Sequence, residues 1–208
     1  MGQARHHYER ALEMHLRDRR IPFISLNEAR RALLPPRQAL RVTELDRDPP
    51  REVTLKSFDH VIYGSPHNLL VDIKGRKVKT RKSAATVGRL ESWVTLEDVE
   101  ALTRWQRLFG SAFRAAFVFV YWCEVQPPDA LFQEIFEHRG RWYAVRAVLL
   151  EDYKAHMTPR SKRWRTVSVP TAAFESISTS LTPSPSREFR VLGGQEEPER
   201  FAPALAAR

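Results

Sequence analysis

The run AAFVFVYWC, residues 115–123, is the feature that most constrains the fold of this chain. It is apolar on both side-chain phases, and no charged residue interrupts it. Successive side chains of a β-strand point to opposite faces of the sheet, so such a strand needs apolar layers on both faces. The run is also far shorter than the ~20 residues that cross a bilayer as a helix. We therefore expect a strand inside a layered α/β domain.

The elements expected before this run agree with a layered domain. Apolar positions at helical spacing predict a helix over residues 4–20. A second helix begins near Thr95, which has the spacing of a capping box with Asp98. Apolar segments around a tight turn predict a hairpin over 53–63 and 68–74. The expected fold class is α/β, with a mixed central β-sheet flanked by helices.

The domain organisation follows from composition along the chain. We expect one domain over residues 1–181. A mobile tail is expected over 182–208, because Ser, Pro, Gly, Glu and Ala dominate there. Prolines among charged residues predict a loop over 35–51.

Charge and cysteine content narrow the function classes. The formal net charge is +9 and the sequence pI is about 10.1, which favours a polyanionic partner, nucleic acid before an anionic membrane. The alternative is a basic surface that only maintains solubility. Cys123 is the single cysteine, which excludes an intrachain disulfide and a zinc site built from cysteines. With no signal-peptide pattern in the sequence given, we expect a soluble cytoplasmic protein without a membrane partner.

Two acids and a lysine interrupt the expected hairpin. Asp72 and Lys74 lie two residues apart on one strand, so they project from the same face. A turn at residues 64–67 sets a register that brings Asp59 opposite Asp72. The Cβ atoms of such a pair are about 4.5–5.5 Å apart, and like charges there repel unless a proton or a cation lies between them.

A magnesium ion suits this arrangement. Mg²⁺ is commonly held by one or two carboxylates, with water and phosphate oxygens completing its octahedron. The alternative is that Asp59 and Asp72 face solvent on an edge hairpin and that Lys74 pairs with one of them. A shift of the register by one residue would also place the acids on opposite faces.

Two polar residues on the predicted helices are candidates for the same site. Glu9 lies at the rim of the apolar face of the first helix, from where it can reach the sheet or remain in solvent. Gln106 interrupts the apolar stripe of the later helix. A buried amide needs hydrogen-bond partners, which a carboxylate or water of the site would supply, and so would nearby backbone.

Basic residues follow the hairpin without an acid until Glu91. A second basic stretch surrounds Trp164, which is expected either to stack on a base or, with a slight preference, to begin a strand and face the core. The residues expected to contact a phosphate backbone are Arg76, Lys77, Lys79, Arg81, Lys82 and Arg89 in the first stretch and Arg160, Lys162 and Arg163 in the second.

Taken together, these residues resemble the PD-(D/E)xK nuclease superfamily, which includes many restriction endonucleases and archaeal Holliday-junction resolvases. The resemblance consists of Asp59, twelve intervening residues, and then Asp72-Ile73-Lys74 at the end of an apolar strand. The order of elements also fits: a helix with an acid, the hairpin, a helix and a buried strand. It covers roughly residues 8–124 and implies a restriction-endonuclease-like fold.

The resemblance also implies roles for the site residues. Asp59 and Asp72 would be ligands of Mg²⁺, and the backbone carbonyl of Ile73 would be the third ligand from the protein. Mn²⁺ is the expected substitute for Mg²⁺. Lys74 would orient or activate the attacking water and steady charge on the phosphate.

Two further residues match the family less strictly. Glu9 resembles an additional helix acid that some members place at the metal, and Gln106 resembles a glutamine on the helix after the signature. Phe58 stands where the motif name has proline, and the second acid, Asp72, stands where glutamate is commoner. These departures lower the specificity of the match and leave its chemistry intact.

The function implied is a magnesium-dependent endonuclease that hydrolyses phosphodiester bonds in DNA. RNA is left open as a substrate, and a homodimer is left open as the assembly. The first alternative is a non-catalytic nucleic-acid-binding module of the same fold. The second is a basic structural protein with no nucleic-acid role.

Overall fold

The computed structural model describes residues 3–27, 29, 40–44, 49–64, 67–78, 90–127 and 134–181. The predicted tail at 182–208 lies outside the described residues, so the division into a domain and a tail stays a prediction. Four of the basic residues expected to contact nucleic acid, Lys79, Arg81, Lys82 and Arg89, also lie outside them.

Helices are interspersed among groups of strands along the chain. The helices are α1 (Gln3–Asp18), α3 (Leu96–Phe109), α4 (Leu150–His156) and α5 (Thr171–Ile177). The strands are β1 (Phe23–Ser25), β2 (Arg41–Glu44), β3 (Arg51–Thr54), β4 (His60–Ile62), β5 (Asn68–Val78), β6 (Val94–Thr95), β7 (Phe113–Cys123), β8 (Ile135–His138), β9 (Arg141–Leu149), β10 (Thr158–Ser161) and β11 (Thr166–Ser168).

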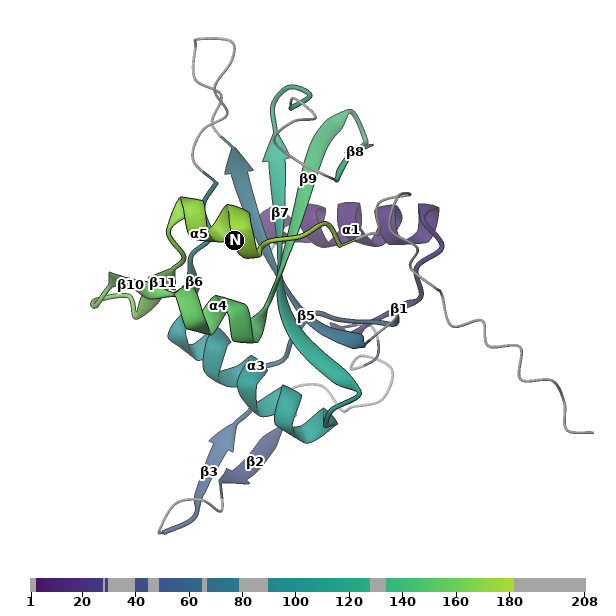
Figure 1. Ribbon diagram of the computed structural model, residues 1–208. Coiled ribbons are helices and arrows are strands. Elements are labelled where there is room, and N and C mark those ends of the chain that lie inside the picture. The colour runs from purple at the N-terminus through teal and green to yellow at the C-terminus, as the bar shows by residue number, and fades with distance from the viewer. Residues whose placement is uncertain are drawn as a thin grey trace, which may run out of the picture.

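The main sheet of the described part has the strand order β1–β4–β5–β7–β9–β8 (Figure 1). β5 and β7 run parallel and pair along their whole length, whereas the other neighbours are antiparallel. β7 contains the apolar run, and residues 115–121 are at most 1% exposed. The prediction of a strand covered on both faces is confirmed.

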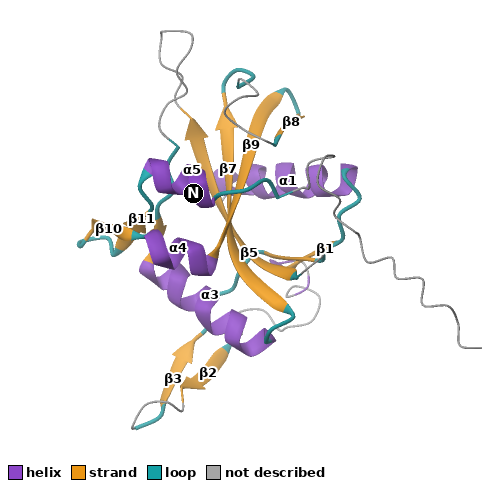
Figure 2. Ribbon diagram, viewed as in Figure 1, coloured by secondary structure: helices purple, strands orange, loops and turns teal. Residues whose placement is uncertain are grey.

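Alternate residues of β7 pack into two separate cores. Phe117 and Phe119 belong to a core with residues of α3, α4 and α5, whereas Val118 and Val120 belong to a core with residues of α1. Helices therefore cover both faces of a strongly twisted mixed sheet (Figure 2). The helix, hairpin, helix and buried strand also follow one another in the predicted order. The predicted α/β fold class, with a mixed sheet flanked by helices, is confirmed.

Close contact between α1 and β5 depends on Gly75. A Cβ atom at this position would overlap Cδ2 of Tyr8, well inside van der Waals contact. Only glycine therefore lets the Tyr8 ring lie directly on the strand. This contact brings the neighbouring Glu9 toward the sheet.

Helix α3 begins as its sequence predicts. The Thr95 side chain accepts from the amide of Asp98, and the Asp98 side chain accepts from the amide of Thr95, which completes a capping box. The helix ends at Gly110, whose φ of 75° lets the chain turn back into β7. No helix among the described residues has the length and apolarity to span a bilayer.

The first strand of the hairpin is shorter than predicted. Residues 51–54 form β3, which pairs with β2 in a separate ribbon that extends from the body of the molecule (Figure 1). β2 itself lies in the stretch predicted to be a loop. Leu55 and Phe58 are both buried, and a spacing of three residues puts them on opposite faces of any regular strand. Residues 55–59 form no strand, so the chain leaves the strand conformation between β3 and β4.

Candidate metal and phosphate site

The register of the hairpin is the one predicted. His60 pairs with Val71 and Ile62 pairs with Leu69, so the same register places Asp59 opposite Asp72. The amide of Asp59 donates to the carbonyl of Val71 at 2.8 Å, which extends the pairing to this position. Asp59 and Asp72 are therefore opposite each other in the hairpin, and the Asp72 carboxylate lies on the face that α3 covers, where Lys74 connects it to Asp98.

Asp59 lies just beyond the end of β4 and binds the neighbouring strand. One of its carboxylate oxygens accepts a hydrogen bond from the amide of Ile73 at 2.6 Å. Burial and the negative charges of Asp72 and Glu9 raise the pKa of Asp59 to about 7, against the hydrogen bond from Ile73 and the charge of Lys74. The charges of two other acids therefore act on Asp59, although α1 carries Glu9 on the other side of the sheet.

Lys74 bridges two buried carboxylates. Its Nζ lies 2.9 Å from Oδ2 of Asp72 and 2.9 Å from Oδ2 of Asp98, and its side chain is 14% exposed. Burial raises the pKa of Asp72, opposed by the charge of Lys74. Burial would also raise the pKa of Asp98, but the charges and hydrogen bonds of Lys74 and Lys56 hold it well below its ordinary value.

Lys56 is the outer member of this chain of charges. Its Nζ donates to Oδ1 of Asp98 and lies 3.8 Å from Glu97. Burial alone would lower the pKa of Lys56, but the hydrogen bond and charge of Asp98 raise it. With 43% of its side chain exposed, Lys56 presents its ammonium group to solvent beside the buried pair.

Asp98 and Lys56 were not singled out as site residues by the sequence. The capping box marked Asp98 as a helix start, a role that already explains an acid at that position. Lys56 stands three residues before Asp59, and no local pattern distinguishes it from a solvated lysine. Only the packing of α3 against β5 brings these two residues to Lys74.

Gln106 does not join these charges in the described structure. Its Oε1 accepts from the amide of Ala115 at 2.7 Å, and its Nε2 donates to Glu151 at 3.1 Å. Because Gln106 lies in the last turns of α3, its side-chain amide hydrogen-bonds to the start of β7. The catalytic role of Gln106 stays a prediction, and the helix residue that contacts Lys74 is Asp98, near the other end of α3.

The basic residues of β5 divide between the two faces of the sheet. Arg76 follows Lys74 on the same face, where its guanidinium lies 4.1 Å from the ring centre of Trp93 and donates to the carbonyl of Gly75 at 2.8 Å. Lys77 is on the other face, with Nζ 2.6 Å from Glu124. Alternation along the strand therefore separates two residues that were predicted to contact one nucleic-acid backbone.

The oxygen atoms at the hairpin suit a hard cation. The Ile73 amide points toward Asp59, and in a strand the carbonyl of the same residue points the same way, beyond the end of β4. This carbonyl and two repelling carboxyl groups fit Mg²⁺ or Mn²⁺, which prefer oxygen ligands. In the described ranges, no group of three or more His, Cys, Asp or Glu side chains is placed to hold a metal. Water and phosphate oxygens would therefore supply the remaining ligands.

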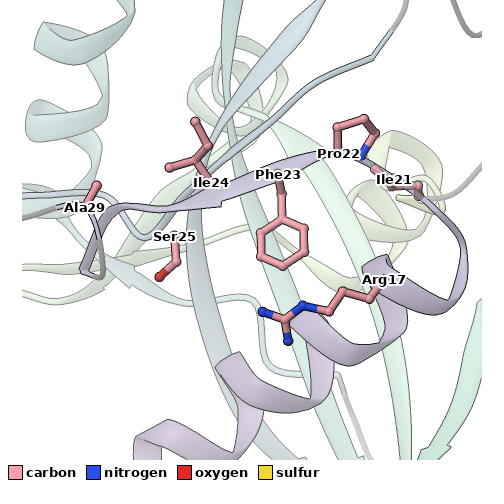
Figure 3. Close-up of a pocket in the computed structure, with 7 residues that line it drawn as sticks. All are labelled: Arg17, Ile21, Pro22, Phe23, Ile24, Ser25 and Ala29. Carbon is pink, nitrogen blue, oxygen red and sulfur yellow. The ribbon is translucent and has the colours of Figure 1, made fainter. Parts of the chain in front are cut away.

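A surface pocket lies elsewhere, along the edge strand β1, with a volume of about 590 Å³ (Figure 3). Its lining residues are Arg17, Ile21, Pro22, Phe23, Ile24, Ser25 and Ala29. The Arg17 guanidinium lies 5.3 Å from the ring centre of Phe23. None of the hairpin acids lines this pocket.

Comparison with known proteins finds little similarity. No protein-family model matches the chain, and no curated protein matches it. Among solved structures it is similar to Hjc, a Holliday junction resolvase from the archaeal hyperthermophile Archaeoglobus fulgidus. The two are 12% identical, the match covers 82% of this chain and 91% of Hjc, and the TM-score is 0.42. At that level, two chains need not share an activity.

Proposed function

We propose that this protein is a magnesium-dependent nuclease that hydrolyses phosphodiester bonds in DNA. The observation that carries the proposal is the hairpin register, which sets Asp59 opposite Asp72 with Lys74 bonded to Asp72 at 2.9 Å. Two carboxylates with raised pKa values, Asp72 buried and Asp59 partly buried, favour binding of a divalent cation, because the cation relieves their repulsion. The net charge of +9 favours a polyanionic substrate.

Some residues of the site would hold the metal, and Lys74 would contact the phosphate. Asp59, Asp72 and the carbonyl of Ile73 would hold the ion, and Glu9 would add negative charge nearby. When bound, Mg²⁺ lowers the pKa of a coordinated water and stabilises charge on phosphoryl oxygens. The protein's own contribution is to place a phosphate between this ion and the ammonium group of Lys74.

Lys74 is suited to contact that phosphate. An ammonium group has three N–H donors, and Asp72 and Asp98 accept from two of them. The third is left for a phosphate oxygen or the attacking water. Asp98 restricts where the ammonium group can lie, and it also holds Lys56, whose exposed end is placed for a neighbouring phosphate.

Plasmid DNA incubated with Mg²⁺ or with EDTA tests the proposal. The wild-type protein should cut only with the metal, and Asp72→Asn and Lys74→Met should each reduce cutting at least about 100-fold. Both variants should remain folded by circular dichroism. Matched controls are Glu52→Gln, in an exposed ion pair on the β2–β3 ribbon, and Lys154→Met, exposed on α4; both should cut like the wild type.

The same assay separates the two main alternatives. If the wild-type protein binds DNA but leaves it intact with Mg²⁺ and with Mn²⁺, the non-catalytic binding module is correct. If both site variants cut at the wild-type rate, the assignment of the site is wrong. Retention on a DNA column that falls steeply with salt would argue against the basic structural protein.

A further inference from the structure

The turn between β10 and β11 carries an aromatic side chain that the core does not explain. Trp164 is 69% exposed, more than any other large hydrophobic side chain among the described residues. The guanidinium of Arg163 lies 5.3 Å from the centre of its ring. The preference for a core position, drawn from sequence, is wrong, because residues 162–165 form a turn that leaves the strand pairing.

This turn is attached to the helix that carries Asp98. The amide of Leu96 donates to the carbonyl of Arg165 at 2.9 Å, and the Arg165 guanidinium lies 3.6 Å from Glu100. β11 also pairs with β6, which leads directly into α3. The β10–β11 hairpin therefore lies at the start of α3 (Figure 1), so the turn and the bridged lysines are held in a fixed relation.

Cationic and aromatic side chains lie between the proposed phosphate site at Lys74 and the β10–β11 turn. On β5, Arg76 is the next residue after Lys74 on the same face; its guanidinium packs on the Trp93 ring and donates to the carbonyls of Gly75 and Trp93. The guanidinium of Arg160, on β10, lies 5.2 Å from the centre of the same Trp93 ring and 3.7 Å from Glu91. Two arginines at one tryptophan thus lie between the proposed phosphate site and the turn, where they can contact a strand of phosphates.

The chemistry at the turn favours one form of nucleic acid. In a duplex the flat faces of the bases are stacked inside, and an aromatic ring at the surface meets only sugar and phosphate. A base in a single-stranded segment has a free face, and an exposed indole beside cationic side chains binds it by stacking. Lys162 and Arg163 directly precede Trp164 and are exposed, so they can reach the adjoining phosphates.

We propose that Trp164 stacks on an unpaired base of a single-stranded DNA segment, whose backbone runs past Arg160 and Arg76 to the phosphate at Lys74. This inference rests on the proposed function for its cleavage step and extends it by naming the substrate class. The preferred substrate is DNA that is single-stranded next to the scissile bond.

Equilibrium binding without metal tests the inference separately from cleavage. In EDTA, a fluorescein-labelled 12-nucleotide oligo(dT) is compared with a blunt-ended duplex of two annealed strands. Trp164→Ala should weaken oligo(dT) binding about 5- to 150-fold, because stacking contributes that much per base, and should leave duplex binding within about twofold. Trp164→Phe should restore most of the loss. The control is Leu108→Ala, which removes another exposed apolar side chain, 56% exposed on α3, and should change neither affinity.

Several outcomes overturn the inference. They are an unchanged oligo(dT) affinity in Trp164→Ala, an equal loss with both DNAs, an equal loss in Leu108→Ala, or no binding of oligo(dT) by the wild type. Cleavage gives an independent reading. A Trp164-dependent affinity without any cutting in Mg²⁺ supports the stacking contact and removes the nuclease proposal. Cutting in Mg²⁺ with an unchanged oligo(dT) affinity in Trp164→Ala supports the nuclease proposal and removes the stacking contact.

Discussion

Replacing Asp59 with asparagine should make the protein more stable in the absence of metal. The wild-type carboxylate is buried opposite Asp72, and burial and this charge together raise its pKa from an ordinary 3.8 to about 7. Asparagine removes the charge and keeps a side-chain oxygen that can accept from the amide of Ile73. The substitution therefore removes the repulsion with little change in shape.

The size of the gain follows from the pKa. A pKa of about 7 in place of 3.8 means that the ionised form is about 4 kcal/mol less stable in the folded protein, which is an upper limit for the gain at pH 8. Because Asp72 shares the repulsion and an amide is a weaker acceptor than a carboxylate, we expect about 2 kcal/mol. For a domain of this length, that raises the melting temperature by about 4–8 °C.

The pH dependence has a definite sign. A carboxyl group whose pKa is raised on folding binds more protons in the folded state, so the wild type loses stability as the pH rises from about 3.8 to about 7. Asparagine does not titrate. The advantage of Asp59→Asn should therefore be smaller at pH 5 than at pH 8.

Thermal denaturation followed by circular dichroism at pH 5 and pH 8, in EDTA and in Mg²⁺, measures these differences. Mg²⁺ should raise the melting temperature of the wild type and have little effect on Asp59→Asn. Glu52→Gln, on the exposed ribbon, should stay within about 0.5 kcal/mol of the wild type. A variant Asp59→Asn that is no more stable than the wild type at pH 8 would refute the argument that the two acids repel.

Two other predictions concern the packing that supports the site. Asp98→Asn keeps an oxygen for the helix cap but loses the charge that holds the two lysines, so kcat for DNA cleavage should fall about 10- to 100-fold. The control, Thr95→Ala, should lose about 1 kcal/mol of stability and retain cleavage. Equal loss of activity in both variants, measured as initial rates, would make Asp98 only a capping residue. Gly75→Ala should destabilise by about 1–3 kcal/mol in urea unfolding, because its Cβ overlaps Tyr8, and adding Tyr8→Ala should recover part of the loss; an unperturbed single variant would contradict the close contact.

Local patterns in the sequence were sufficient to predict a feature where the neighbours of a residue along the chain decide its geometry. The apolar run of β7, the capping box of α3 and the register that sets Asp59 opposite Asp72 were all predicted and are present. Each depends on side-chain alternation or on a turn of defined length. The predicted strand over 53–63 was too long, because residues 51–54 pair with β2 and residues 55–59 form no strand.

Contacts between distant segments were decided only by the tertiary structure. Periodicity fixes which face of an element a residue occupies, but it carries no information about which other element packs there. The docking of α3 on β5 selects Asp98 as the partner of Lys74 and leaves Gln106 to the start of β7. The same docking brings Lys56 to the acids, and the β10–β11 turn leaves Trp164 in solvent. The sequence by itself thus determined two acids and a lysine on one hairpin face, whereas long-range packing determined which charges surround them.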